Sequence, residues 1–130
     1  MITPVFTRLR SLLQAHAGDF SVSHDTVERY GLEAPAGPAT LKAWGGKAKL
    51  SRIPIAWVEL RKNYVSYHLM GIDGNAKLTS SLSEPLRAHM QGKTCFNFKR
   101  ADEKLLAELE RLTPAALAAM RKLRFVADPS

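Results

Sequence analysis

Residues 54–70 read PIAWVELRKNYVSYHLM, and this stretch predicts one long β-hairpin. Neighbouring side chains on a strand point to opposite sides of the sheet, so alternate residues form two faces. The predicted core face joins these apolar side chains: Ala56, Val58, Leu60, Val65, Tyr67 and Leu69. The predicted second face is mixed: Ile55, Trp57, Glu59, Arg61, Tyr64, Ser66, His68 and Met70. The hairpin therefore predicts a sheet with one apolar face in the core and one mixed face outside it.

The turn of this hairpin decides which side chains lie opposite one another. A turn at Lys62 and Asn63 gives three apolar pairs: Leu60 with Val65, Val58 with Tyr67, and Ala56 with Leu69. Asn tolerates the left-handed conformation of a tight turn, but Lys is a poor first turn residue, so a turn shifted by one position stays open. That shift moves each pairing by two residues and leaves the faces unchanged. Trp57 then lies opposite His68 or Ser66, and this pair is the first candidate site.

The composition predicts a single domain over residues 1–130. With 45% hydrophobic residues, the chain can bury a core that needs no covalent staples. Its single cysteine, Cys95, cannot form an internal disulfide, and no Cys–Cys or Cys–His spacing indicates a zinc site. Arg8 and Arg10 interrupt the apolar start, and no apolar run approaches the roughly 20 residues of a membrane span. We therefore expect a cytoplasmic protein with no membrane association, no metal and no cofactor.

A formal net charge of +7 favours acidic partners, although charge alone does not identify a target. Nucleic acid is an unlikely partner, because the aromatic spacing of an RNA-binding sheet and a helix-turn-helix are both missing. The GGKAK run at residues 45–49 lacks the upstream glycine and the Ser or Thr after Lys that a P-loop needs. We interpret residues 45–50 as a mobile basic loop.

Apolar residues at helical spacing predict an N-terminal helix, a short central helix and a C-terminal helical pair. The residues expected to start or end them are Thr3 and Gly18, Ser83 and Gly92, Asp102, and Thr113 with Pro114. The central helix carries Leu86 and Met90. The last residues, 127–130, should be frayed.

Period-two alternation predicts further strands in residues 20–33, 41–44 and 93–99. In residues 20–33, Tyr30 and Leu32 are expected to point inward. In residues 93–99, Phe96 and Phe98 should share one side, with Cys95 and Asn97 on the other. The predicted fold is α+β, a two-layer sandwich with a single antiparallel sheet of about five strands and helices packed on one face.

Three stretches resemble the YdhG-like family of small bacterial proteins, a group mostly without assigned function. They are KNYVSYHLM at 62–70, MQGKTCFNFK at 90–99 and DEKLLAELERLT at 102–113, and the similarity is clearest over residues 53–112. The resemblance implies a compact two-layer fold, an antiparallel sheet with helices on one side. Some family members carry the label of iron chaperone, by analogy with the frataxin fold, and an iron-binding protein is thus one alternative. Frataxin-type sites use a ridge of carboxylates starting on the first helix, whereas this first helix has no acid before Asp19.

The leading functional hypothesis is a non-enzymatic binding module. Ile55, Trp57 and Met70 are too apolar to be left in water without a reason, so the second face should bind a ligand or another subunit. The candidate ligand-binding residues are Trp57, His68, Tyr64, Trp44, Lys93 and Cys95. We expect an anionic small molecule or a protein partner there, and a homodimer is an open alternative.

A thiol-dependent enzyme centred on Cys95 is a further alternative. Positive charge at Lys93 and Lys99 could lower the pKa of the thiol, whereas an inert, half-buried cysteine is the simpler interpretation. His24 and Asp25 fit a turn better than a metal or base site. No residue is assigned a catalytic role.

Overall fold

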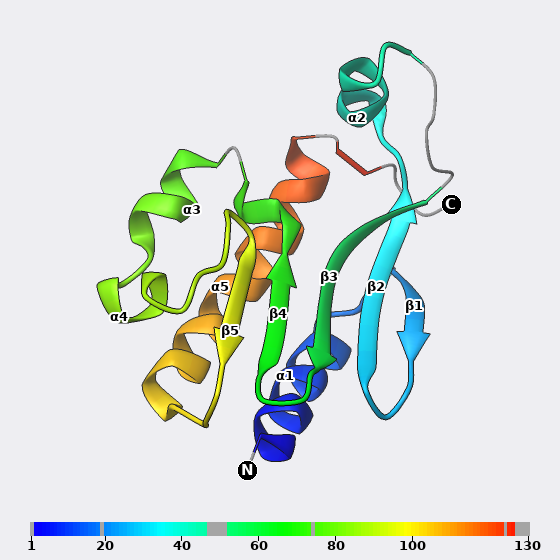
Figure 1. Cartoon of the computed structure of the whole chain (residues 1–130). Coiled ribbons are helices and arrows are strands. Elements are labelled where there is room, and N and C mark those ends of the chain that lie inside the picture. Colours follow the sequence, from blue (N-terminus) through cyan, green and yellow to red (C-terminus); the bar gives the residue numbers. More distant parts are fainter. Residues whose placement is uncertain (1, 19, 47–51, 74, 124, 127–130) are drawn as a thin grey trace.

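The computed structural model describes residues 2–18, 20–46, 52–73, 75–123 and 125–126. Along the chain the elements are α1 (Thr3–Ala15), β1 (Ser21–Asp25), β2 (Arg29–Pro35), α2 (Pro38–Ala43), β3 (Arg52–Leu60), β4 (Val65–Leu69), the 3-10 turn η1 (Met70–Ile72), α3 (Ala76–Ser81), α4 (Glu84–Arg87), β5 (Cys95–Phe98) and α5 (Glu103–Lys122). The strands form one five-stranded antiparallel sheet in chain order, and α1 and α5 lie against the same side of it (Figure 1). The expected α+β fold is confirmed. Within the described ranges, no helix combines the length and the apolar character that crossing a membrane would need.

The β3–β4 hairpin has the register predicted for a turn at Lys62 and Asn63. All three expected apolar pairs form: Leu60 with Val65, Val58 with Tyr67, and Ala56 with Leu69. The backbone N–H of Arg61 donates to the carbonyl of Tyr64 at 2.8 Å and closes the turn. Trp57 pairs with His68, so the register that places it opposite Ser66 is excluded.

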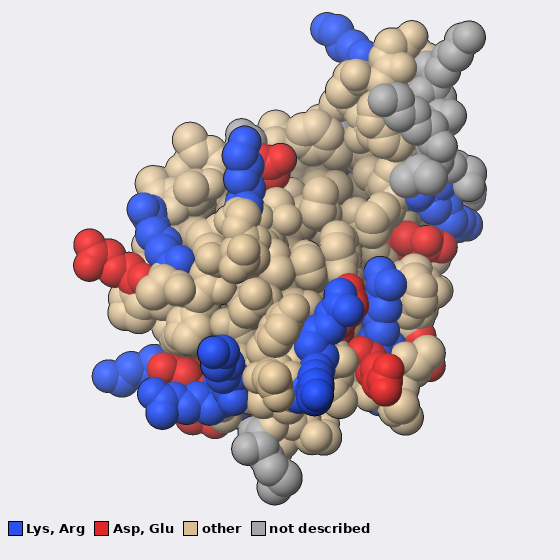
Figure 2. Space-filling view, viewed as in Figure 1, with Lys and Arg blue, Asp and Glu red and all other residues tan. Residues whose placement is uncertain are grey.

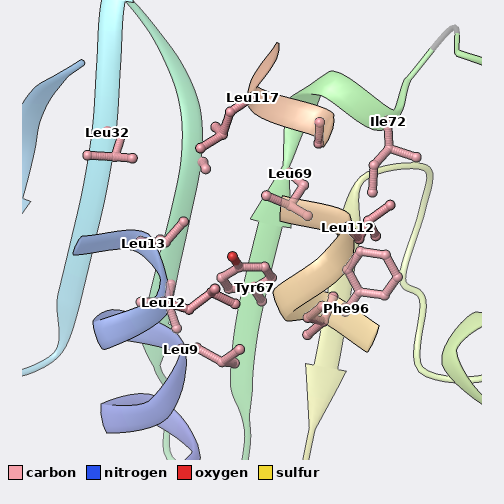
Figure 3. Packing of buried hydrophobic residues seen from close by; sticks show 14 of the residues in the cluster. Leu9, Leu12, Leu13, Leu32, Tyr67, Leu69, Ile72, Phe96, Leu112 and Leu117 are labelled. Carbon is pink, nitrogen blue, oxygen red and sulfur yellow. The ribbon is translucent and has the colours of Figure 1, made fainter. Parts of the chain in front are cut away.

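The core lies between the sheet and the two long helices (Figure 3). Helix α1 contributes a buried stripe at helical spacing: Val5, Phe6, Leu9, Leu12 and Leu13. From the sheet, Tyr30, Leu32, Phe96 and Phe98 are buried on this side, as their alternation predicts. Each side chain of this size stabilises the fold by roughly 1.5–3 kcal/mol when fully buried. The core face is therefore the dry side of the sheet.

One hydrogen bond crosses this dry layer. The Tyr67 hydroxyl on β4 and Oγ1 of Thr113 on α5 lie 2.7 Å apart, and both residues are completely buried. Burial raises the pKa of Tyr67 above its usual value, so the hydroxyl stays protonated and able to donate. The bond joins the middle of the sheet to the middle of α5.

A β-bulge in β3 overturns the predicted position of Ile55 on the second face. The pairs on either side of it are Leu32 with Ala56 and Glu33 with Pro54. Ile55 is therefore an extra residue between two pairings, and such an insertion exchanges the faces of the strand. Ile55 is fully buried in the helix-covered core instead.

Met70 also leaves the second face on which it was predicted. The strand β4 ends at Leu69, and Met70 begins the 3-10 turn η1, which lies against α5. Its side chain lines a cavity of about 250 Å³ together with Met120 and Phe125. Of the three apolar residues expected on the second face, Trp57 alone stays there.

The predicted C-terminal helical pair is wrong, because α5 runs unbroken for 20 residues with Pro114 inside it. Proline removes one backbone hydrogen bond and normally interrupts a helix. Here the buried stripe continues on both sides of it, from Leu105 to Met120, so packing against the sheet compensates for the lost bond. Asp102 caps this helix as predicted, accepting from the N–H groups of Lys104 and Leu105.

Smaller differences concern the connections. Residues 41–44, predicted as a strand, belong mostly to α2, which has Pro38 at its first position, where proline suits a helix. Ser83 caps α4 as predicted, but this helix ends at Arg87 rather than near Gly92. The predicted basic loop at 45–50 and the predicted frayed end at 127–130 fall mainly or wholly outside the described residues.

Candidate functional site

Two rows of side chains cross the side of the sheet that α1 and α5 leave uncovered. Backbone pairing aligns the first row across four strands: Gly31, Trp57, His68 and Cys95. The second row runs beside it: Arg29, Glu59, Ser66 and Asn97. Strand alternation places both rows on one face, which we call the open face.

The first row is centred on a stacked pair. The rings of Trp57 and His68 lie 4.3 Å apart between centroids, with an angle of 10° between their planes. The indole N–H of Trp57 donates to Oε1 of Glu59 at 3.1 Å, and the second oxygen of Glu59 accepts from Arg61 at 2.8 Å. Gly31 leaves room for this ring, because a Cβ there would lie 3.2 Å from the Cβ of Trp57. The indole is thus held by stacking on one side and by a carboxylate at its edge.

His68 is held in its neutral form by its surroundings. Partial burial lowers the pKa of the imidazole, and the positive charges of Arg29 and Arg61 lower it further, while Glu59 acts in the opposite direction. Nε2 of His68 lies 3.6 Å from Sγ of Cys95. A neutral ring stacked on Trp57 is therefore the resting state at neutral pH.

Cys95 is not activated by its surroundings. Burial raises the pKa of the thiol, and the negative charge of Glu59 raises it further, against a smaller opposite effect of Arg61. The thiol donates to Oδ1 of Asn97 at 3.4 Å. The expected effect of Lys93 and Lys99 on the thiol is absent, because neither contributes to the shift. A protonated thiol is a poor nucleophile, so the geometry does not favour the thiol-dependent enzyme.

Ser66 lies in the second row with its hydroxyl unsatisfied. The residue is 4% exposed, and Oγ has no hydrogen-bond partner among the described residues. Most buried polar groups are hydrogen-bonded, so an exception either lowers the stability of the fold or is a group that a ligand can hydrogen-bond. Ser66 therefore adds a polar group beneath the centre of the open face.

The open face carries the Glu59 carboxylate, paired with Arg61, in its second row, and exposed Lys and Arg side chains along one edge. Figure 2 shows this side of the molecule, with Lys and Arg side chains gathered over the β3–β4 turn and over the end of β5 near the start of α5. Trp57, His68, Cys95 and Asn97 are each partly exposed there. The arrangement combines aromatic rings with nearby cations, which suits a ligand that has both a planar and an anionic part.

A groove of about 940 Å³ opens beside the rows at the end of β5. Its lining residues are Tyr64, Ala88, His89, Met90, Gln91, Asn97, Lys99 and Arg100. Residues 89–91 form its far wall, because the N–H of Gln91 donates to the carbonyl of Cys95, and the N–H of Asn97 donates to that of His89. Asn97 belongs to both the groove and the second row, so the two features are continuous.

The structure brings together three of the six predicted site residues. Trp57, His68 and Cys95 form one row, whereas Tyr64 lines the neighbouring groove, which these three do not line. Trp44 does not join them: it lines the cavity of about 250 Å³ with Met120 and Phe125 on the helix side. Lys93 is exposed in the segment before β5 and makes no hydrogen bond or ion pair with any described residue.

Sequence reasoning missed His89 and Arg100 as members of the site. His89 ends a helical turn, and it reaches the groove because its backbone pairs with the outer edge of β5. This pairing joins a helix end to a strand edge, and no pattern of neighbouring residues in the sequence predicts it. Asn97, by contrast, alternates with Phe96 and Phe98, and this signal already placed it on the open face.

Metal binding finds no support in the part of the chain that the structure describes. No three His, Cys, Asp or Glu side chains gather there closely enough to hold an ion. The acidic ridge of frataxin-type sites also has no counterpart on α1, whose Arg8 and Arg10 pair with Glu103 and Asp25 instead. Among the described residues, the iron-binding alternative therefore gains no supporting observation.

In the comparison with known proteins, no family model, no curated protein and no solved structure matches the chain. The resemblance to the YdhG-like family therefore stays a prediction. Function has to be inferred from the open face itself.

Proposed function

We propose that this protein is a non-enzymatic binding module whose open face accepts an anionic small molecule with a planar ring. The observation that carries the proposal is the Trp57–His68 stack, which is partly exposed beside basic side chains on a face that α1 and α5 leave uncovered. Aromatic side chains left partly in water are a common feature of ligand sites. The YdhG-like family assignment belongs to the same proposal and rests on the sequence stretches alone.

The charges on this face favour an anionic ligand over a second copy of the chain. Arg61, Lys62, Lys99 and Arg100 are exposed along its basic edge, and the whole chain carries a net charge of +7. Two copies meeting through this face would bring like charges together, which costs free energy and steers against the wrong partner. A homodimer through the open face is therefore disfavoured.

The two tryptophans allow a test with an internal control. Each indole N–H gives its own signal in a ¹H–¹⁵N NMR spectrum, and a Trp57→Phe variant assigns them. We expect adenosine diphosphate to shift the Trp57 signal at about 5 mM, a concentration that reveals even a millimolar Kd. The Trp44 signal should stay in place, because Trp44 lies on the helix side of the sheet.

Neutral adenosine is the matched control ligand, since it has the same ring without the phosphates. We expect it to shift the Trp57 signal far less than adenosine diphosphate does. Equal shifts for both ligands would remove the anionic part of the proposal. A Trp57 signal that does not respond to either ligand would reject the open face as a site for ligands of this class.

A further inference from the structure

We infer that the groove at the end of β5 is the anion-binding part of this site and holds the phosphate group of its ligand through Lys99 and Arg100. The inference rests on the proposed function and names the chemistry of the ligand more closely. The groove is lined by both cations and contains no Asp or Glu among its lining residues.

Both cations are without a side-chain partner among the described residues, in contrast to several arginines. Several other arginines are paired: Arg8 with Glu103, Arg10 with Asp25, Arg52 with Glu33 and Arg61 with Glu59. Neither Lys99 nor Arg100 forms an ion pair or hydrogen bond through its side chain with any residue the structure describes. An anion entering the groove would therefore gain two charged partners without breaking an existing pair.

The polar groups around these cations are oriented in advance. A backbone carbonyl can only accept, so Nδ1 of His89 donates to the carbonyl of Asn97 at 3.0 Å, and the ring also stacks on Phe98 with centroids 5.1 Å apart. These two contacts fix the imidazole where it lines the groove. Oδ1 of Asn97 accepts from the Cys95 thiol, which directs the amide nitrogen of Asn97 to another acceptor.

The chemistry of the lining set fits a phosphate ester. Lys99, Arg100, the Asn97 amide and the Tyr64 hydroxyl all supply N–H or O–H donors, and phosphate oxygens accept several such bonds at once. A groove of this volume also lies within the size range of small-ligand sites. Because Asn97 stands in the same row as Ser66, a ligand bound by its phosphate here can extend toward His68 and Trp57.

The probe for the test is inorganic pyrophosphate, which has the anionic groups and no ring. Isothermal titration and backbone NMR shifts should show it binding at residues 89–100. In a Lys99→Gln/Arg100→Gln variant we expect at least a tenfold weaker affinity, equivalent to ~1.4 kcal/mol. Exchanging the two residues, Lys99→Arg with Arg100→Lys, should largely restore binding.

A control variant separates the groove from the net charge of the protein. Arg111→Gln/Lys122→Gln removes the same two charges from exposed positions of α5, on the far side of the sheet. We expect its affinity for pyrophosphate to stay within about twofold of the wild type. An equal loss in both variants would show general electrostatic attraction and overturn the inference. Circular dichroism confirms that each variant is folded, as expected for exposed residues.

The design also separates this inference from the proposed function. Pyrophosphate has no ring, so its binding does not depend on Trp57, whereas the adenosine diphosphate experiment does. If pyrophosphate does not bind at millimolar concentration, the groove assignment fails whatever Trp57 reports. If single-stranded RNA binds through Lys99 and Arg100 and pyrophosphate does not compete with it, the small-ligand inference is overturned in favour of nucleic acid.

Discussion

The two faces of the sheet are made by the same strands and yet differ in almost every physical property. On the helix-covered face, Tyr67, Phe96 and Phe98 are completely buried, and the Tyr67 hydroxyl is paired with Thr113. On the open face, His68 and Cys95 are partly exposed, and the buried Ser66 hydroxyl has no partner in the part of the chain that the structure describes. The polar group of the first face is satisfied by the fold, whereas the Ser66 hydroxyl of the second is not satisfied by any described residue. This difference teaches that the side chains of one face are used for packing, and it leaves the other face for the binding that we propose.

The largest expected difference between the two sides of the sheet is in the loss of stability when a glycine on each side is replaced by alanine. A Cβ at Gly71, in η1, would lie 2.0 Å from the carbonyl oxygen of Ala116 in α5. Backbone cannot rotate away, so Gly71→Ala should separate η1 from α5 and lower the free energy of unfolding by at least about 3 kcal/mol. Urea denaturation followed by circular dichroism measures this.

The matched variant on the open face is Gly31→Ala. Its nearest obstacle is the Ser23 hydroxyl at 2.7 Å, which belongs to a side chain that can rotate, followed by the Cβ of Trp57 at 3.2 Å. We expect a loss of about 1 kcal/mol at most. Equal losses for Gly71→Ala and Gly31→Ala would contradict the division into a tight face and a tolerant one.

A smaller effect should distinguish the two buried hydroxyls. Thr113→Val keeps the shape of the side chain and leaves the Tyr67 hydroxyl buried without a partner, which should cost about 1–3 kcal/mol. Ser66→Ala removes a hydroxyl that no described residue hydrogen-bonds, so stability should change by no more than about 0.5 kcal/mol or should rise. Chemical denaturation of both variants measures the contrast. A costly Ser66→Ala together with a neutral Thr113→Val would reverse it.

The smallest expected effect is a dependence of stability on pH that comes from the open face. Burial first, then Arg29 and Arg61, lower the pKa of His68 in the folded state relative to its usual value near 6.5. The unfolded chain therefore binds a proton more readily, and this contribution to stability is lost as the pH falls below about 6.5.

His68→Gln tests this sign. The variant should lose less stability than the wild type when urea denaturation at pH 7.5 is compared with that at pH 5. An identical acid dependence in both proteins would mean that His68 titrates normally. An opposite difference would mean that Glu59, rather than burial and the arginines, controls the imidazole.

Much of the sheet could be predicted because its signals are local. Alternation in residues 54–70 placed Val58 and Tyr67 on one face and Trp57 and His68 on the other, and the same pattern placed Asn97 on the open face. The positions of Ile55 and Met70 could not be predicted in this way. The bulge at Ile55 is defined by the pairing of β3 with β2, which no pattern within β3 reveals. Met70 leaves the sheet because β4 ends where η1 contacts α5. The continuous helix through Pro114 likewise depends on packing against the sheet.

The sequence by itself determined the two faces of the hairpin and the caps of α4 and α5, because side-chain alternation and capping act over a few residues, whereas it left the hairpin register open between two turns. The tertiary structure decided which face stayed open, that Trp44 and Lys93 lie away from Trp57, and that His89 and Arg100 reach the groove. These placements depend on contacts between segments distant in the chain, and on the space that α1 and α5 occupy on one side of the sheet. No local pattern contains that information.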